Sequence, residues 1–193
     1  MNELSSLALE LQTFCEHRNW SFCLIGGLAL QHWGEPRFTK DVDMTLLTGF
    51  GNEEPFVREW LANYPSRIPD PETFALANRV LLLRSTDGIG IDIAFGALPF
   101  EETAVARATK VEMEPGASLR ICTAEDLIVM KAFADRPQDR VDLRGILVRQ
   151  SPGHLDWKYI WENLTPLAEI KGEPGILSHL QSLIQEVRNG EAP

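Results

Sequence analysis

The sequence predicts an α/β or α+β fold in which a mixed sheet is followed by a helical C-terminal part. Short apolar runs rich in strand-forming residues alternate with segments of helical spacing up to about residue 118. Beyond Thr123 every regular segment has helical spacing. We therefore expect a sheet-containing core at 1–118 and a helical region at 119–193. The boundary between them is soft and would also suit one compact domain.

Elements in the first half of the chain follow from the spacing of apolar residues and from the turns between them. Apolar side chains recur at helical intervals from Leu4 to Phe14, which predicts an amphipathic opening helix. The turn TDG separates two apolar runs and predicts a β-hairpin. In order, we expect a helix at 4–18, a strand at 21–25, a short helix at 28–33, a strand at 42–47, a helix at 53–64, a loop at 65–74, and strands at 79–85 and 89–96.

The second half carries clear signals for the starts and ends of helices. Thr123 is a good N-cap, and Asp126 three residues later makes a variant of the capping box. Pro137 ends one helix and can open the next. We expect a helix at 100–108, a last short strand at 119–123, and helices at 124–134, 137–150, 155–170 and 176–188.

Composition excludes several classes of protein. The 193 residues carry a formal net charge of −10, which argues against an extended DNA-binding groove. No run approaches the roughly 20 apolar residues of a membrane span, and the N-terminus lacks a basic leader. Three cysteines without CxxC or zinc-type spacing are best interpreted as reduced, mostly buried thiols. We therefore expect a cytoplasmic protein that does not contact membranes.

Three aspartates stand in apolar runs where an uncompensated charge would be costly. Asp41 and Asp43 lie two residues apart, so on a strand they share one face. Asp92 stands between isoleucines in a second predicted strand. Carboxylates on adjacent strands can hold a hard divalent cation such as magnesium or manganese. The alternatives are a turn or cap role for the first two and an edge-strand charge for Asp92.

A pair of glycines, Gly26 and Gly27, ends the first apolar run and precedes a short helix. Bare backbone amides at a helix N-terminus suit a phosphate group. On its own the pair would be better explained as a tight turn. Followed by Asp41 and Asp43, it predicts that a phosphate site and a metal site face each other.

Three segments together resemble a known superfamily. They are GGLALQHWGEPRFTKDVDMTL, VLLLRSTDGIGIDIAFG and TAEDLIVMKAFADRPQDRVDLRGIL, in this order. Their combination resembles the DNA polymerase β-like nucleotidyltransferases. Within that superfamily it is similar to the AbiEii-type nucleotidyltransferases of bacterial toxin–antitoxin and phage-defence systems. The resemblance covers roughly residues 20 to 148.

The resemblance implies roles for particular residues. Lys131 matches a lysine of the family on the helix after the sheet and would contact the triphosphate, although a lysine on a helix is usually just solvated. Arg37, Thr39 and Lys40 stand in the family's basic segment and would also support the triphosphate, or simply compensate charge. Asp139 matches a further family acid, with Asp142 close by. The implied metal ligands and catalytic residues are Asp41, Asp43 and Asp92, and the implied phosphate contacts are Gly26 and Gly27.

The implied activity moves a nucleoside monophosphate from a nucleoside triphosphate to a hydroxyl, with Mg²⁺ or Mn²⁺. The acceptor stays open between a tRNA end, a partner protein and a small molecule, since the chain has a shorter C-terminal region than its larger relatives. A non-catalytic nucleotide-binding or antitoxin-like module is the main alternative, and the three intact carboxylates speak against it. A small metal-dependent phosphohydrolase is a third possibility.

Overall fold

The computed structural model describes residues 2–151 and 153–190, which fall into two units. The first unit comprises the chain up to Leu28 together with Phe38–Cys122. The second comprises Ala29–Arg37 and the chain from Thr123 onward. A mixed sheet accompanied by helices confirms the α+β fold class. The division into a core and a C-terminal region near residue 118 stays a prediction.

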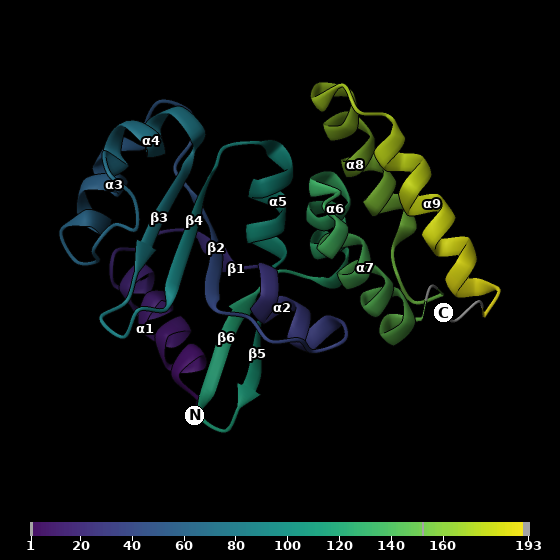
Figure 1. Ribbon diagram of the computed structural model, residues 1–193, viewed down its shortest axis with the longest axis horizontal. Coiled ribbons are helices and arrows are strands. Elements are labelled where there is room, and N and C mark those ends of the chain that lie inside the picture. Colours follow the sequence, from purple (N-terminus) through teal and green to yellow (C-terminus); the bar gives the residue numbers. More distant parts are fainter. Residues whose placement is uncertain (1, 152, 191–193) are drawn as a thin grey trace. The chain divides into compact units, whose positions relative to one another are not determined.

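Within the described residues, the first unit is built on a six-stranded mixed sheet of order β3-β4-β2-β1-β6-β5 (Figure 1). Strands β2 and β4 run parallel, as do β1 and β6, and the other neighbours are antiparallel. The predicted hairpin is confirmed as β3 and β4. The strands are β1 (Phe22–Leu24), β2 (Asp41–Leu47), β3 (Val80–Arg84), β4 (Gly90–Gly96), β5 (Thr109–Glu114) and β6 (Ala117–Ile121).

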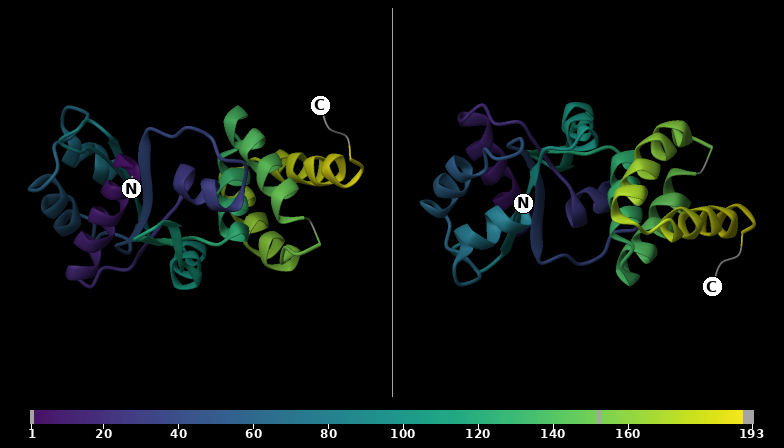
Figure 2. Two further views of the ribbon diagram at one scale, coloured as in Figure 1. Left: turned by 90° about the horizontal axis from the view of Figure 1, so that it is seen from below. Right: turned by 90° about the horizontal axis from the view of Figure 1, so that it is seen from above.

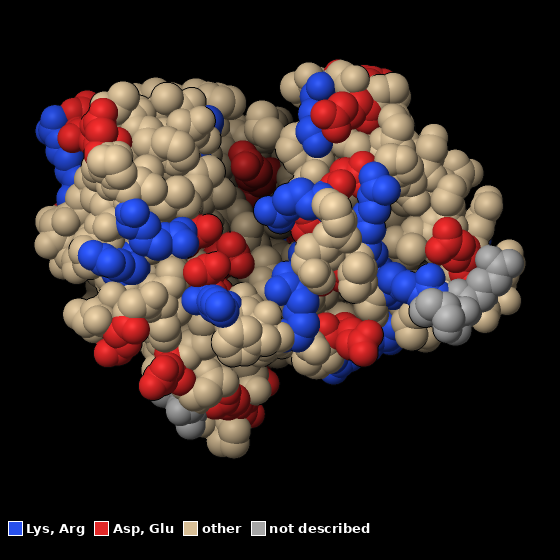
Figure 3. All heavy atoms as spheres, in the orientation of Figure 1, with Lys and Arg blue, Asp and Glu red and all other residues tan. Residues whose placement is uncertain are grey.

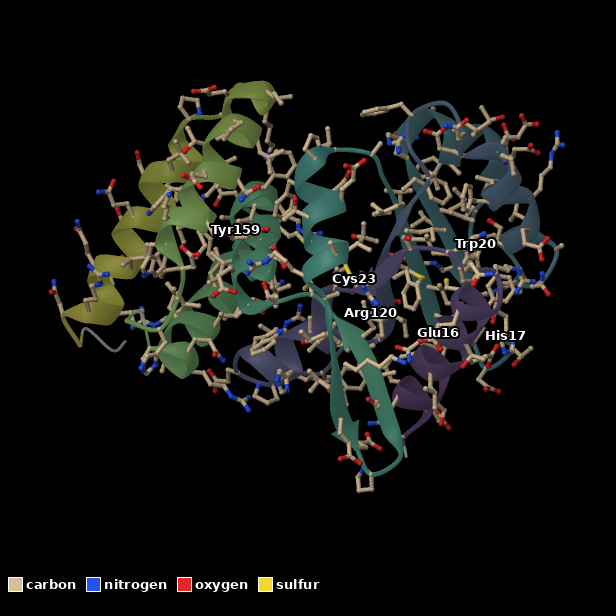
Figure 4. The ribbon with its side chains drawn as sticks, turned by 180° about the vertical axis from the view of Figure 1, so that it is seen from behind. Glu16, His17, Trp20, Cys23, Arg120 and Tyr159 are labelled. Carbon is tan, nitrogen blue, oxygen red and sulfur yellow. The ribbon has the colours of Figure 1, made fainter. Side chains whose placement is uncertain are left out.

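The two faces of the central strand β2 differ in chemistry because side chains alternate along a strand. Val42, Met44 and Leu46 point to one face and are fully buried. Helix α1 (Glu3–His17) packs against β2 and β6, behind the strands in Figure 1 and in front of them in Figure 4. Helix α5 (Pro99–Arg107) packs against β2 and β1. The other helices of this unit are α3 (Glu54–Leu61) and α4 (Pro71–Asn78).

The second unit is a group of helices that pack on one another (Figure 2). Thr123 caps α6 by accepting from the Asp126 backbone, and the Asp126 carboxylate accepts from Thr123 in return. This confirms the predicted capping box. Tyr159 of α8 donates to Asp126 Oδ1 at 2.5 Å, which ties α8 to α6 (Figure 4). The helices are α6 (Ala124–Ala134), α7 (Pro137–Gln150), α8 (Trp157–Lys171) and α9 (Gly175–Arg188).

Sequence-based prediction was wrong at two places. The expected loop at 65–74 gives way to α4, which starts at Pro71 because proline is well suited to the first helical position. Strand β5 was missed because its residues are mostly polar and none of them is buried, and it pairs with β6 as a hairpin. Cys15, Cys23 and Cys122 are buried thiols, as expected. Among the described helices, none is long and apolar enough to span a membrane.

Candidate active site

The sheet brings the three predicted aspartates to one face. Strands β2 and β4 are paired so that Asp43 lies opposite Asp92 and Asp41 lies opposite Gly90. Paired residues of neighbouring strands point to the same side, and residues two apart on one strand do too. The side chains of Asp41 and Asp92 are partly exposed. This face of the sheet therefore carries three carboxylates that are at least partly accessible to solvent.

The two glycines lie against this acidic face. Helix α2 (Gly26–Trp33) begins at Gly26, which has a φ of +58°. A Cβ atom at Gly26 would stand 2.1 Å from Asp43 Oδ2, and one at Gly27 would stand 2.5 Å from Thr39 Oγ1. The Gly27 N–H donates to Asp43 Oδ2 at 3.4 Å. Both glycines are therefore needed for the close approach of α2 to the strand and its preceding loop.

Gly27→Ala should destabilise the protein by about 1–3 kcal/mol, because the added methyl group would overlap the Thr39 side chain. Thr39→Gly in the same chain removes all three Thr39 side-chain atoms that the methyl group would meet and should restore part of the loss. Denaturant unfolding of the two variants measures both effects. If the double variant were no more stable than Gly27→Ala, packing against Thr39 would not be the reason for glycine here.

The basic segment before β2 is divided between the two units. Thr39 packs against Gly27 and donates from Oγ1 to the Asp41 carbonyl oxygen at 3.3 Å. Lys40 is exposed. Arg37 belongs to the second unit, where it pairs with Asp142. Of the three predicted triphosphate contacts, only Thr39 has a described contact with the acidic face.

Sequence reasoning missed Arg67, which lies on the loop between α3 and α4. Its Nη2 donates to Asp92 Oδ1, and its Nη1 stands 3.7 Å from Asp41 Oδ1. The guanidinium thus contacts two of the three candidate metal ligands. No local pattern in the sequence pointed to this residue, because its partners are 25 or more residues away and it lies outside every motif.

The donor set suits a hard divalent cation, since three carboxylates share one face of adjacent strands. Among the described residues, no group of three or more His, Cys, Asp or Glu side chains is gathered closely enough to hold a metal ion. Oxygens of all three aspartates lie near hydrogen-bond donors, from Arg67 or from the Gly27 amide. The residues therefore suit the ion in chemical type and share one face of the sheet, and their side chains would have to turn to ligate it.

A second group of charged residues is buried in the helical unit. Lys131 of α6 is only 6% exposed, and its Nζ lies 2.6 Å from Asp142 Oδ2 and 3.2 Å from Asp139 Oδ1 on α7. Both aspartates are buried as well. A buried lysine between two buried carboxylates differs from the solvated lysine that was the alternative interpretation. Asp139 and Asp142, which the sequence left difficult to tell apart, both contact the same ammonium group.

Two arginines complete this buried cluster from its outer side. Arg37 makes a bidentate contact with Asp142, with Nε at 2.8 Å from Oδ1 and Nη2 at 3.0 Å from Oδ2. Arg136 makes a similar contact with Asp139. The side chain of Arg37 is partly exposed and that of Arg136 largely so. We use the name buried charge cluster for Arg37, Lys131, Arg136, Asp139 and Asp142.

The buried charge cluster gives the protein an expected acid sensitivity. Burial raises the pKa of Asp142, but hydrogen bonds from Arg37, Lys131 and Gln138 outweigh it and lower that pKa to about 2. The ordinary pKa is higher, so the unfolded chain binds the proton first as the pH falls. The stabilisation is therefore present above about pH 4 and is lost as the pH falls toward 2.

Asp142→Asn should flatten this part of the stability profile, because the variant has no carboxylate to titrate at that position. Urea unfolding of the wild type and the variant between pH 2 and pH 6 measures the slope. Asp87→Asn is the matched control, since Asp87 is an exposed carboxylate in the turn between β3 and β4. Equal slopes for the wild type and Asp142→Asn would contradict the expectation.

Comparisons with known proteins bear on the family and the fold of the chain. A family model described as the nucleotidyl transferase AbiEii toxin of a type IV toxin–antitoxin system matches residues 16–150. No curated protein sequence matches the chain. A crystal structure of an antigenic nucleotidyltransferase-like protein from Paracoccidioides brasiliensis is similar with a TM-score of 0.54 and 16% identity, over 93% of this chain and 92% of that one.

A second similar structure is that of the lincosamide antibiotic adenylyltransferase LnuA bound to lincomycin. The TM-score is 0.50 and the identity 11%, over 75% of this chain and 98% of that one. At such low identity both structures bear on the fold alone. They confirm the nucleotidyltransferase fold that the three sequence motifs predicted.

Proposed function

Because the chain belongs to the AbiEii family of nucleotidyltransferases, we propose that it uses a divalent metal ion to transfer a nucleoside monophosphate from a nucleoside triphosphate to a hydroxyl group. The observation that carries the proposal is the register of β2 and β4, which puts Asp41, Asp43 and Asp92 on one face. A module that only binds a partner has no need to hold three carboxylates together at the cost of their mutual repulsion.

In the proposed reaction the acceptor hydroxyl oxygen forms a bond to the α-phosphorus, and the bond from that phosphorus to the β-phosphate oxygen breaks. Pyrophosphate leaves, and the proton of the hydroxyl is released. Magnesium or manganese, when bound, would lower the pKa of the hydroxyl and neutralise charge on the departing pyrophosphate. Asp41, Asp43 and Asp92 would hold the ion.

The start of α2 would serve the phosphate side of the reaction. Gly26 and Gly27 let the start of α2 lie close to Asp43 and Thr39, and the backbone amides of this helix N-terminus would be the donors to a phosphate group. Thr39 packs on the same turn and would keep it in place. We therefore assign these residues to nucleotide positioning.

The contacts in the buried charge cluster support roles for its residues that differ from those implied by the family resemblance. Lys131 is buried and already contacts two carboxylates, so direct binding of a triphosphate would leave Asp139 and Asp142 without it. We assign Lys131 and Asp139 to holding α6 and α7 together. Arg37 keeps the triphosphate role that the family resemblance implies, and its side chain is partly exposed while its guanidinium pairs with Asp142.

The acceptor is the open part of the proposal. On the face drawn in Figure 3, basic and acidic side chains of the described residues are interspersed in small groups. Together with the net charge of −10, this favours an acceptor that binds through few contacts over a long nucleic acid. A tRNA end, a hydroxyl of a partner protein and a small molecule all meet this requirement. The family description names a toxin of a type IV toxin–antitoxin system, and we include a place in such a system in the proposal.

One experiment tests the transfer and its rivals together. The protein is incubated with each α-labelled nucleoside triphosphate, with magnesium or manganese, and with total RNA or cell lysate. A nucleotidyltransferase labels an RNA, a protein or a small molecule in the mixture. A phosphohydrolase consumes the triphosphate and labels nothing. A non-catalytic module leaves the triphosphate intact, and that outcome would overturn the proposal.

A further inference from the structure

We propose that Arg67 is a built-in counter-ion that competes with the divalent metal for Asp41 and Asp92. The proposal rests on the function proposed above, because it concerns the same carboxylates. It assigns a positioning role to a residue that lies outside all three sequence motifs. Its starting point is the pair of contacts that the Arg67 guanidinium makes with these two aspartates.

The backbone around Arg67 is fixed to the edge of the sheet. The Arg67 N–H donates to the Leu82 carbonyl oxygen of β3 at 3.1 Å, and the Arg84 N–H donates to the Pro65 carbonyl oxygen at 3.0 Å. Strand β3 is the edge strand beside β4, and β4 lies beside β2. The side chain of Arg67 therefore reaches from the sheet edge past β3 to contact aspartates on two further strands.

The position opposite Asp41 leaves room for this contact. That position is Gly90, where a Cβ atom would stand 1.9 Å from Asp41 Oδ1 and 3.0 Å from Arg67 Nη1. Any other residue would displace the carboxylate or the guanidinium. The glycine thus allows Asp41 and Arg67 to meet above the sheet.

The guanidinium and a metal ion are both cations, so each weakens the binding of the other to the same two carboxylates. Magnesium requires carboxylate oxygens at about 2.0–2.1 Å in near-octahedral geometry. Oδ1 of Asp92 accepts from Nη2 of Arg67, and Oδ1 of Asp41 lies 3.7 Å from Nη1 of the same guanidinium. Because the side chain of Arg67 is 30% exposed, it can turn toward solvent while its backbone stays on β3. Metal binding would thus exchange one cation for another on the same two carboxylates.

Competition between Arg67 and the metal ion predicts how the affinity for metal changes, without nucleotide, when the Arg67 charge is removed. Removing the Arg67 charge should tighten the binding of Mn²⁺ on the order of tenfold, because the ion then meets the carboxylates without a competing cation. The same change should lower the melting temperature without metal, since the carboxylates would repel one another. Saturating Mn²⁺ should remove most of this difference.

The test compares wild type, Arg67→Gln and the control Arg58→Gln by calorimetric titration with Mn²⁺ alone, together with melting curves. Arg58 is an exposed arginine of α3 that pairs with Glu54 and Glu72, so its loss removes a charge away from the site. We expect a roughly tenfold lower dissociation constant for Arg67→Gln and a change of less than about twofold for Arg58→Gln. Arg67→Lys keeps the charge but cannot contact both aspartates through two guanidinium nitrogens. Its dissociation constant for Mn²⁺ should lie between those of wild type and Arg67→Gln.

The outcomes separate this inference from the proposed function. Equal or weaker Mn²⁺ binding by Arg67→Gln, with measurable binding by the wild type, would overturn the competition and leave the metal-dependent transfer standing. Absence of Mn²⁺ binding in the wild type and in both Arg67 variants would overturn the metal part of the proposed function and the inference with it. If Arg67→Gln did not fold, Arg67→Lys alone decides, and an affinity no tighter than that of the wild type would contradict the inference.

Discussion

Asp43→Asn should reduce nucleotidyl transfer on the order of 10³-fold or more while the protein stays folded. Asp43 lies opposite Asp92 in the register of β2 and β4, and its Oδ2 accepts from the Gly27 amide. Asparagine keeps the size of the side chain and can still accept that hydrogen bond. What it loses is the negative charge that would bind the metal ion.

The measurement is the rate of label transfer from an α-labelled triphosphate to the acceptor, with a melting curve for each variant. Asp87→Asn is again the matched control, because it removes a carboxylate from the turn that leads into β4. The control should transfer label at the rate of the wild type. Transfer by Asp43→Asn within tenfold of the wild type would show that the acidic face is not the catalytic centre.

Much of the fold could be predicted because the buried strands carry their own signal. Met44 and Leu46 alternate with Asp43 and Thr45, and this period of two is enough to predict that Asp41 and Asp43 share a face. Strand β5 lacks such a signal, since its residues are mostly polar and form a strand through their pairing with β6. Local patterns therefore identify strands that bury a face better than strands that lie at an edge.

The sequence predicted those residues of the candidate site that lie in short motifs, and it missed the others. The aspartates and glycines were found because each belongs to a short segment with a chemical rationale. Arg67 could not be found, because its role depends on a loop pairing with the edge strand β3 and on a long side chain reaching over the sheet. The burial of Lys131 was equally hidden, since the helix that carries it has apolar residues on most of its surface.

Lys131→Met should lower the free energy of unfolding by about 2–3 kcal/mol, because two buried carboxylates would lose the ammonium group between them and keep Arg37 and Arg136 as their cationic partners. Methionine fills nearly the same volume, so the loss reports the charge more than a cavity. A domain is typically stable by about 5–15 kcal/mol, and such a loss would be a large part of that total. The expectation differs from that for an exposed lysine, whose replacement changes stability by no more than about 0.5 kcal/mol.

Denaturant unfolding at neutral pH measures this loss, and Lys158→Met is the matched control on α8, where the lysine side chain is 83% exposed. Adding Asp139→Asn and Asp142→Asn to Lys131→Met should recover part of the stability, because no buried charge is then left opposite the missing ammonium. A non-hydrolysable triphosphate distinguishes the two roles considered for this residue. If Lys131→Met were as stable as the wild type but bound the triphosphate at least tenfold more weakly, Lys131 would be a nucleotide contact and not the centre of the buried charge cluster.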